Sequence, residues 1–155
     1  MNKYFFRGLL KDENDFAYGG VLQGHGEFSV IFSAKTGKHT SLEIEKRVVR
    51  TDTLGQYVQV DDKNNKMIFE GDVVKVRCSQ LEYECCGAVV FDDGAFYIKY
   101  RSKNSNEIVY HQLVNNQVFY SEDGQEPQEL NYSYEVLGNI YQNPELLKES
   151  EAIES

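Results

Sequence analysis

The chain has 155 residues, of which 25 are acidic and 16 basic, and its formal net charge is −9. This length suits one domain, or one domain with a small extension. The negative charge disfavours nucleic acid as a partner, because an acidic protein repels phosphates. The sequence holds no apolar run near the roughly 20 residues of a membrane-spanning helix and no charged leader at Met1. We therefore expect a cytoplasmic protein that does not bind membranes.

The residue types favour sheet over helix. Eleven Tyr and nine Phe are spread along the chain, and it holds 12 Gly but only two Pro. Aromatics in alternating segments are typical of strands, and many glycines indicate tight turns. Residues 39–49 alternate as a strand does, although LEIEKRVV also fits two helical turns. Other alternating segments that we interpret as strands are residues 3–10, 15–23, 27–34, 107–113, 117–120 and 132–141.

The central stretch, residues 54–100, predicts the core of the fold. Within it, Asp93-Gly94 fits a two-residue hairpin turn with positive φ at both positions. Such a turn pairs Asp92 with Ala95, Phe91 with Phe96, Val90 with Tyr97 and Val89 with Ile98. The side chains that this register directs toward the core are Val89, Phe91, Phe96, Ile98 and Tyr100.

A second turn is predicted at Glu70-Gly71-Asp72, between two alternating segments. Gly71 can supply a left-handed residue, and Asp72 can accept hydrogen bonds from nearby backbone N–H groups. In the strand that follows, Val74, Val76 and Cys78 would share one face.

The last third of the chain predicts a hairpin, a loop, a strand and a helix. Residues 107–113 and 117–120 would pair around Asn115-Asn116, because asparagine tolerates positive φ. Residues 121–131 would form a polar surface loop, and Gly138 indicates a bulge in the next strand. Asn143 would then cap a short helix with Pro144 in its first turn.

Together these segments predict roughly nine or ten short strands at the spacing of all-β domains. We expect a mainly β protein, in which short antiparallel strands form a small, curved, partly open β-barrel with a short C-terminal helix. Residues 1–50 would form an N-terminal hairpin region packed on the core, residues 51–143 the β core, and residues 144–155 the helix and an acidic tail.

No recognisable set of metal or cofactor ligands is present in the sequence. The cysteines, Cys78, Cys85 and Cys86, are odd in number and the three histidines are far apart, so we expect reduced structural thiols and no zinc site. Asp61-Asp62 and Asp92-Asp93 are carboxylate pairs that could serve as acid and base or bind a divalent ion. Both pairs lie in predicted turns, where Asp is favoured for its backbone bonds. We expect no cofactor and no catalytic residue, and therefore no enzyme.

Several sequence blocks carry a family resemblance. They are FRG and YGG near the start, LGQY and DDKNNKMIFEGDVVKV in the middle, GAVVFDDGAFYIKY next, and EVLGNIYQNPELL at the end. In this order, over nearly the whole chain, they resemble the YopX family of bacteriophage and prophage proteins, with Phe16 where members commonly have tryptophan. The resemblance implies a small phage or prophage protein of a bacterial host, with no catalytic residues to carry over, and it allows self-association.

Two functions fit these observations. The first is a non-enzymatic protein-interaction module that binds a host or phage protein, or a second copy of itself. An acidic surface and many tyrosines favour it.

The alternative is a small β-barrel that binds single-stranded nucleic acid with aromatic and basic side chains. Its candidate residues are Lys75, Arg77, Lys99, Arg101 and Lys103. A second basic cluster comprises Lys46, Arg47 and Arg50. The same cations can instead be solvated edge charges that discourage strand pairing.

Overall fold

The computed structural model describes residues 4–36, 42–102, 104–114, 116–119 and 128–150. The protein is mainly β, with 63% strand in antiparallel sheets and one short helix, which confirms the predicted fold class. The described residues form no closed barrel, so the sheets stay partly open. The chain divides into two compact units, Met1–Tyr57 and Val58–Ser155.

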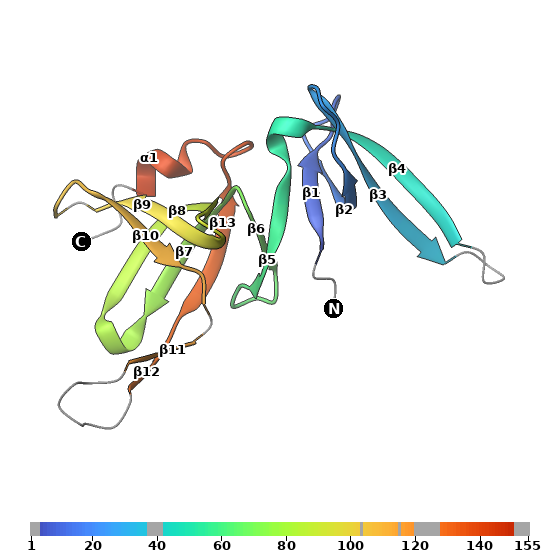
Figure 1. The fold of residues 1–155 in the computed structure, drawn as a ribbon. Coiled ribbons are helices and arrows are strands. Elements are labelled where there is room, and N and C mark those ends of the chain that lie inside the picture. Colours follow the sequence, from blue (N-terminus) through green and yellow to red (C-terminus); the bar gives the residue numbers. More distant parts are fainter. Residues whose placement is uncertain (1–3, 37–41, 103, 115, 120–127, 151–155) are drawn as a thin grey trace. The chain divides into compact units, whose positions relative to one another are not determined.

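The first unit is a curled antiparallel sheet in the order β4-β3-β2-β1-β5 (Figure 1). Its elements are β1 (Phe6–Leu9), β2 (Phe16–Leu22), β3 (Phe28–Thr36), β4 (Leu42–Arg50), the 3-10 turn η1 (Thr51–Thr53) and the start of β5 (Gly55–Asp61). A bridge between Leu10 and Val49 links the end of β1 to β4, which curls the sheet around a small core. Ala17, Ile31 and Val49 form that core.

The sequence of residues 39–49 fitted both a strand and two helical turns. In the structure, the described part of this segment belongs to strand β4. It pairs with β3 along its whole length, from Phe28 opposite Arg50 to Thr36 opposite Leu42. Pairing with β3 satisfies the backbone hydrogen bonds of both strands, and two isolated helical turns would gain much less.

The second unit is built on a five-stranded antiparallel sheet in the order β10-β9-β8-β7-β13, with a separate ribbon of β11 and β12 and with β6 beside β5 (Figure 1). Its elements are β6 (Met67–Phe69), β7 (Asp72–Cys78), η2 (Ser79–Leu81), β8 (Tyr83–Asp92), β9 (Ala95–Arg101), β10 (Ile108–Gln112), β11 (Asn116–Phe119), β12 (Gln128–Asn131), β13 (Ser133–Asn139) and helix α1 (Leu146–Ser150). Helix α1 packs on β8 and β13.

One face of this sheet forms the main core. Val74 and Val76 of β7 are fully buried, as are Cys85 of β8 and Ile98 of β9. Val58, Val60 and Ile68 pack against them from β5 and β6. Full burial of a Val or Ile side chain contributes about 1.5–3 kcal/mol, so this face supplies most of the hydrophobic stabilisation of the unit.

The predicted β8–β9 hairpin is confirmed in turn and register. Asp93 has φ 44° and Gly94 has φ 81°, and the strand pairs are those that the two-residue turn requires. Val89 and Ile98 are buried as expected, but Phe91 is 54% exposed. It lies next to the turn, where its ring contacts Phe96 at 5.0 Å between centroids instead of the core.

The predicted turn at residues 70–72 is also confirmed. Gly71 has φ 84°, and the backbone N–H of Phe69 donates to Oδ2 of Asp72 at 2.8 Å. Asp72 is 1% exposed. Its hydrogen bond to Phe69 therefore compensates in part for the hydration that the carboxylate loses on burial.

Three predictions for the last third of the chain were wrong, and so was the predicted number of strands. Strand β10 pairs with β9, and β11 pairs with β12, so residues 107–113 and 117–120 form no hairpin with each other. Strand β12 lies inside the segment predicted as a loop, and the described part of the chain holds thirteen strands rather than roughly nine or ten. Helix α1 begins only at Leu146, and Oδ1 of Asn143 accepts the N–H of Asn139 at 3.3 Å instead of capping the helix.

The bulge predicted at Gly138 is confirmed, because the β13–β7 register shifts between Val136 and Gly138. Within the described residues, no helix combines the length and the hydropathy that crossing a lipid bilayer requires.

Candidate functional site

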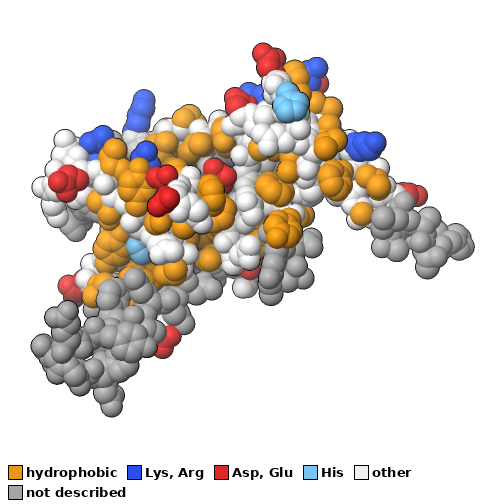
Figure 2. All heavy atoms as spheres, viewed as in Figure 1, with side chains coloured by type: hydrophobic (Ala, Val, Ile, Leu, Met, Phe, Trp, Pro, Cys, Tyr) orange, Lys and Arg blue, Asp and Glu red, His pale blue; other side chains and the backbone are white. Residues whose placement is uncertain are grey.

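An exposed apolar surface covers one side of β2, β3 and β4. Adjacent strands place Leu22, Val30 and Val48 in one row, and Gly20, Phe32 and Lys46 in the next. Six large side chains on this side are at least 40% exposed; they define the apolar face and are Tyr18, Leu22, Phe28, Phe32, Ile44 and Val48. Figure 2 shows apolar side chains at the surface over β3 and β4.

Charge is divided between the two sides of the β3–β4 hairpin. Lys46 and Arg50 alternate with Ile44 and Val48 and therefore lie on the apolar face, and both are exposed. Nζ of Lys11 lies 5.0 Å from the ring centre of Phe28, so a third cation borders the face.

The carboxylates of β4 lie on the opposite side. There Glu45 forms ion pairs with Lys35 at 2.8 Å and with Arg47 at 3.1 Å. The hydrogen bond and charge of Lys35, together with the charge of Arg47, lower the pKa of Glu45. The second basic cluster from the sequence is therefore split, with Arg47 on one side and Lys46 and Arg50 on the other.

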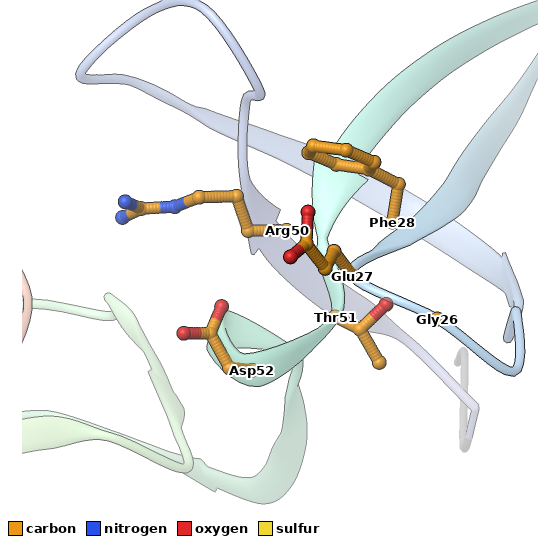
Figure 3. Close-up of a pocket in the computed structure, with 6 residues that line it drawn as sticks. All are labelled: Gly26, Glu27, Phe28, Arg50, Thr51 and Asp52. Carbon is orange, nitrogen blue, oxygen red and sulfur yellow. The ribbon is translucent and has the colours of Figure 1, made fainter.

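A pocket of about 630 Å³ lies at one end of the apolar face, where β3 begins and β4 ends (Figure 3). Phe28 and Arg50, which are opposite each other in the strand register, both line it. The remaining lining residues are Gly26, Glu27, Thr51 and Asp52.

Hydrogen bonds between β1, β3 and the end of β4 fix the backbone around the pocket. The N–H of Thr51 donates to the carbonyl of Glu27 at 2.8 Å, and the hydroxyls of Ser29 and Thr51 are 2.8 Å apart. Thr53 donates to the carbonyl of Arg50 at 2.7 Å and accepts the N–H of Leu9 at 2.9 Å. These bonds preorganise the pocket. The Phe28 ring lies beside Arg50 and the carboxylates of Glu27 and Asp52, an arrangement that suits binding of a partly apolar group.

Four of the five predicted nucleic-acid residues lie on β7 and β9 of the second unit, and each of these four cations contacts another group of the protein. Lys75 pairs with Glu84 at 2.8 Å, and Arg77 pairs with the same carboxylate. Burial would raise the pKa of Glu84, but the two cations outweigh burial and lower it.

The β9 residues are engaged as well. Nζ of Lys99 lies 5.7 Å from the ring centre of Tyr110, and Arg101 donates to the carbonyl of Asn106 at 2.8 Å. Lys103 lies outside the described residues.

The two carboxylate pairs lie in different settings. Asp92 and Asp93 are exposed at the tip of the β8–β9 hairpin. Asp62 is 6% exposed, and its carboxylate accepts N–H groups of Asn64, Lys66 and Val136 at 2.7, 3.0 and 3.2 Å. Among the residues with described positions, no group of three or more His, Cys, Asp or Glu side chains could hold a metal ion.

The three cysteines are free and buried, as the reduced-thiol interpretation expected. Burial raises the pKa of the Cys86 thiol to about 11, although the nearby Lys75 opposes this shift. A protonated, buried thiol is a poor nucleophile.

A second pocket, of about 290 Å³, lies in the second unit among tyrosines and one histidine. The hydroxyls of Tyr83 and Tyr100 are 2.8 Å apart, and the ring of His111 lies 4.7 Å from that of Tyr132. Burial raises the pKa of Tyr83 and lowers that of His111, so both side chains are neutral at pH 7. Tyr134 donates to the carbonyl of Val114 at 2.6 Å, and burial raises its pKa to about 12.

Sequence reasoning missed both the apolar face and this aromatic cluster. A signal for the face was present, because Phe28, Val30 and Phe32 make one side of a strand apolar while Ile31, on its other side, is also apolar and is buried. A strand that carries apolar residues on both sides of an antiparallel sheet needs cover on both.

The chain is a mainly antiparallel β protein that carries a large exposed apolar face. The family model described as YopX protein matches residues 5–148, so the chain belongs to the YopX family. A similar solved structure is the crystal structure of protein EF1440 from Enterococcus faecalis, with 22% sequence identity, a TM-score of 0.46, and coverage of 92% of this chain and 96% of that chain. No curated protein matches the chain.

Proposed function

We propose that this YopX protein is a non-enzymatic interaction module that binds a partner protein through the apolar face. The observation that carries the proposal is the exposure of that face, with Leu22 at 69% and Ile44 at 59%. The solvated side of an antiparallel sheet normally carries polar residues. Contiguous apolar patches on soluble proteins mark interaction sites.

Covering the apolar face would favour association with a partner. Six half-exposed large apolar side chains, once covered, would contribute on the order of 5 kcal/mol before the entropic cost of association. The adjoining pocket, with the Phe28 ring on its wall, suits an anchoring side chain of the partner. Family membership supports a host or phage protein as that partner, in the cytoplasm of a bacterium.

Nucleic-acid binding by β7 and β9 has weaker support. Each of the four described cations there already contacts a carboxylate, a ring or a carbonyl. A titration with single-stranded DNA and RNA at about 50 mM salt tests this alternative, which requires binding that weakens steeply as salt rises.

Affinity capture from bacterial lysate tests the leading proposal when three proteins are compared. These are the full chain, the double variant L22S/I44S on the apolar face, and the control E43S on the opposite side of β4. Wild type and E43S should retain the same proteins, and L22S/I44S should lose them. Equal capture by L22S/I44S, or no protein captured by wild type, would show that the face is not a docking surface.

A further inference from the structure

The distribution of charge on the apolar face restricts what can bind there. The described β2–β4 side chains on this face include Lys46 and Arg50 but no carboxylate, whereas the chain as a whole has an excess of nine negative charges. The absence of carboxylates is therefore not a reflection of composition. Glu27 and Asp52 lie beyond the strand ends, in the pocket next to Arg50.

The cations are set among the apolar side chains. Lys46 is directly opposite Phe32, and Arg50 is directly opposite Phe28. A partner that covers these rings also removes water from the two cations. An unpaired buried charge is costly, so the partner must supply acceptors for them.

A second copy of the chain docked through the same face brings no β2–β4 carboxylate to these cations. In a two-fold interface each patch meets itself, so two faces that both carry Lys46 and Arg50 would lie against each other. A partner with carboxylates is favoured instead, because opposite charges across an interface increase both specificity and association rate.

Resting on the proposed function, we propose that the apolar face binds an extended segment of a different protein in which carboxylates are interspersed with apolar side chains. Lys46 and Arg50 are four residues apart on β4, which is about 13 Å along a strand. Val48 lies between them on the same side. The best match is therefore an acidic residue, an apolar residue two positions later, and a second acidic residue two positions after that.

Selection from a phage-displayed library of random dodecapeptides tests this chemistry, with the immobilised full chain as the target. We expect selected peptides to be enriched at least twofold in Asp plus Glu, with acidic pairs four residues apart around an apolar residue. A synthetic peptide from this set should bind the K46E variant at least tenfold more weakly. The matched control is R47E, which makes the same charge change one residue away on the opposite side of β4 and should alter affinity less than twofold.

Urea denaturation of K46E and R47E shows whether either exposed substitution disturbs the fold, and R50E provides a second charge variant on the face. Selected peptides that are not acidic, and whose binding is lost in L22S/I44S, would overturn the inference and leave the proposed function standing. Selection of no peptide, or of peptides that L22S/I44S still binds, would count against both.

Two further results would each overturn the inference by identifying a different occupant. One is binding of a fluorescein-labelled dT20 oligonucleotide that is lost in K46E. The other is a dimer in light scattering that dissociates in L22S/I44S.

Discussion

The buried carboxylate of Asp62 joins the turn after β5 to strand β13. One of its oxygens accepts the N–H groups of Asn64 and Lys66, and the other accepts that of Val136. A hydrogen bond to a charged group contributes about 1.5–3 kcal/mol, and an orphaned buried donor costs about 1–3 kcal/mol. We therefore expect D62A to lower the free energy of unfolding by about 3–4 kcal/mol. D62N, which keeps one acceptor oxygen, should lower it by about 1–2 kcal/mol.

Urea denaturation at pH 7 measures these differences, with the exposed hairpin carboxylate of Asp92 changed to Asn as the control. Burial acts to raise the pKa of Asp62, but the three N–H donors outweigh it, and the net pKa is lowered. The stabilisation is therefore present above the pKa of the unfolded chain and is lost as pH falls through the lower folded value. D62N should show a shallower loss of stability below about pH 4. A D62A protein within about 0.5 kcal/mol of wild type would refute the structural role of this carboxylate.

Three other substitutions or reactions test the second unit. A Cβ on Gly87 would lie 2.2 Å from the carbonyl oxygen of Lys99, so G87A should cost about 3 kcal/mol in thermal unfolding, and an unchanged Tm would contradict this close approach. Because the three thiols are buried and the pKa of Cys86 is raised to about 11, a thiol reagent at pH 8 should react at least about 100-fold faster in urea than in the native protein; equal rates would show that the thiols are accessible. Burial lowers the pKa of His111, so its neutral form stabilises the fold above the unfolded pKa of about 6.5 and this contribution is lost as pH falls. H111Q should reduce the difference in urea midpoint between pH 5 and pH 8, and an undiminished difference would assign it to another group.

The sequence predicted best the features that depend on neighbouring residues. Asp and Gly are among the few residue types that tolerate positive φ, and Asp93 and Gly94 both adopt it. The two-residue turn then determines every pair in the β8–β9 hairpin. The turn at Gly71 and the bulge at Gly138 follow from equally local preferences.

Pairing between distant strands could not be predicted in the same way. The segments before and after Asn115-Asn116 have the form of a hairpin, yet β10 pairs with β9. Alternation specifies which side chains share a face, but not which edge a strand joins. Phe28, Val30 and Phe32 indicated an apolar side of one strand, but the extent of the apolar face depends on three strands that lie side by side in register.

Strand β5 has a consequence for how this protein can be dissected. It runs from Gly55 to Asp61, across the boundary between the compact units at Tyr57 and Val58. A truncation after Arg50 would discard Thr53, whose hydroxyl accepts from Leu9, together with Gly55 and its pairing to β1. A cut at the boundary would end inside β5, and a cut after Arg50 would remove hydrogen bonds to β1. The binding studies proposed above therefore need the full chain.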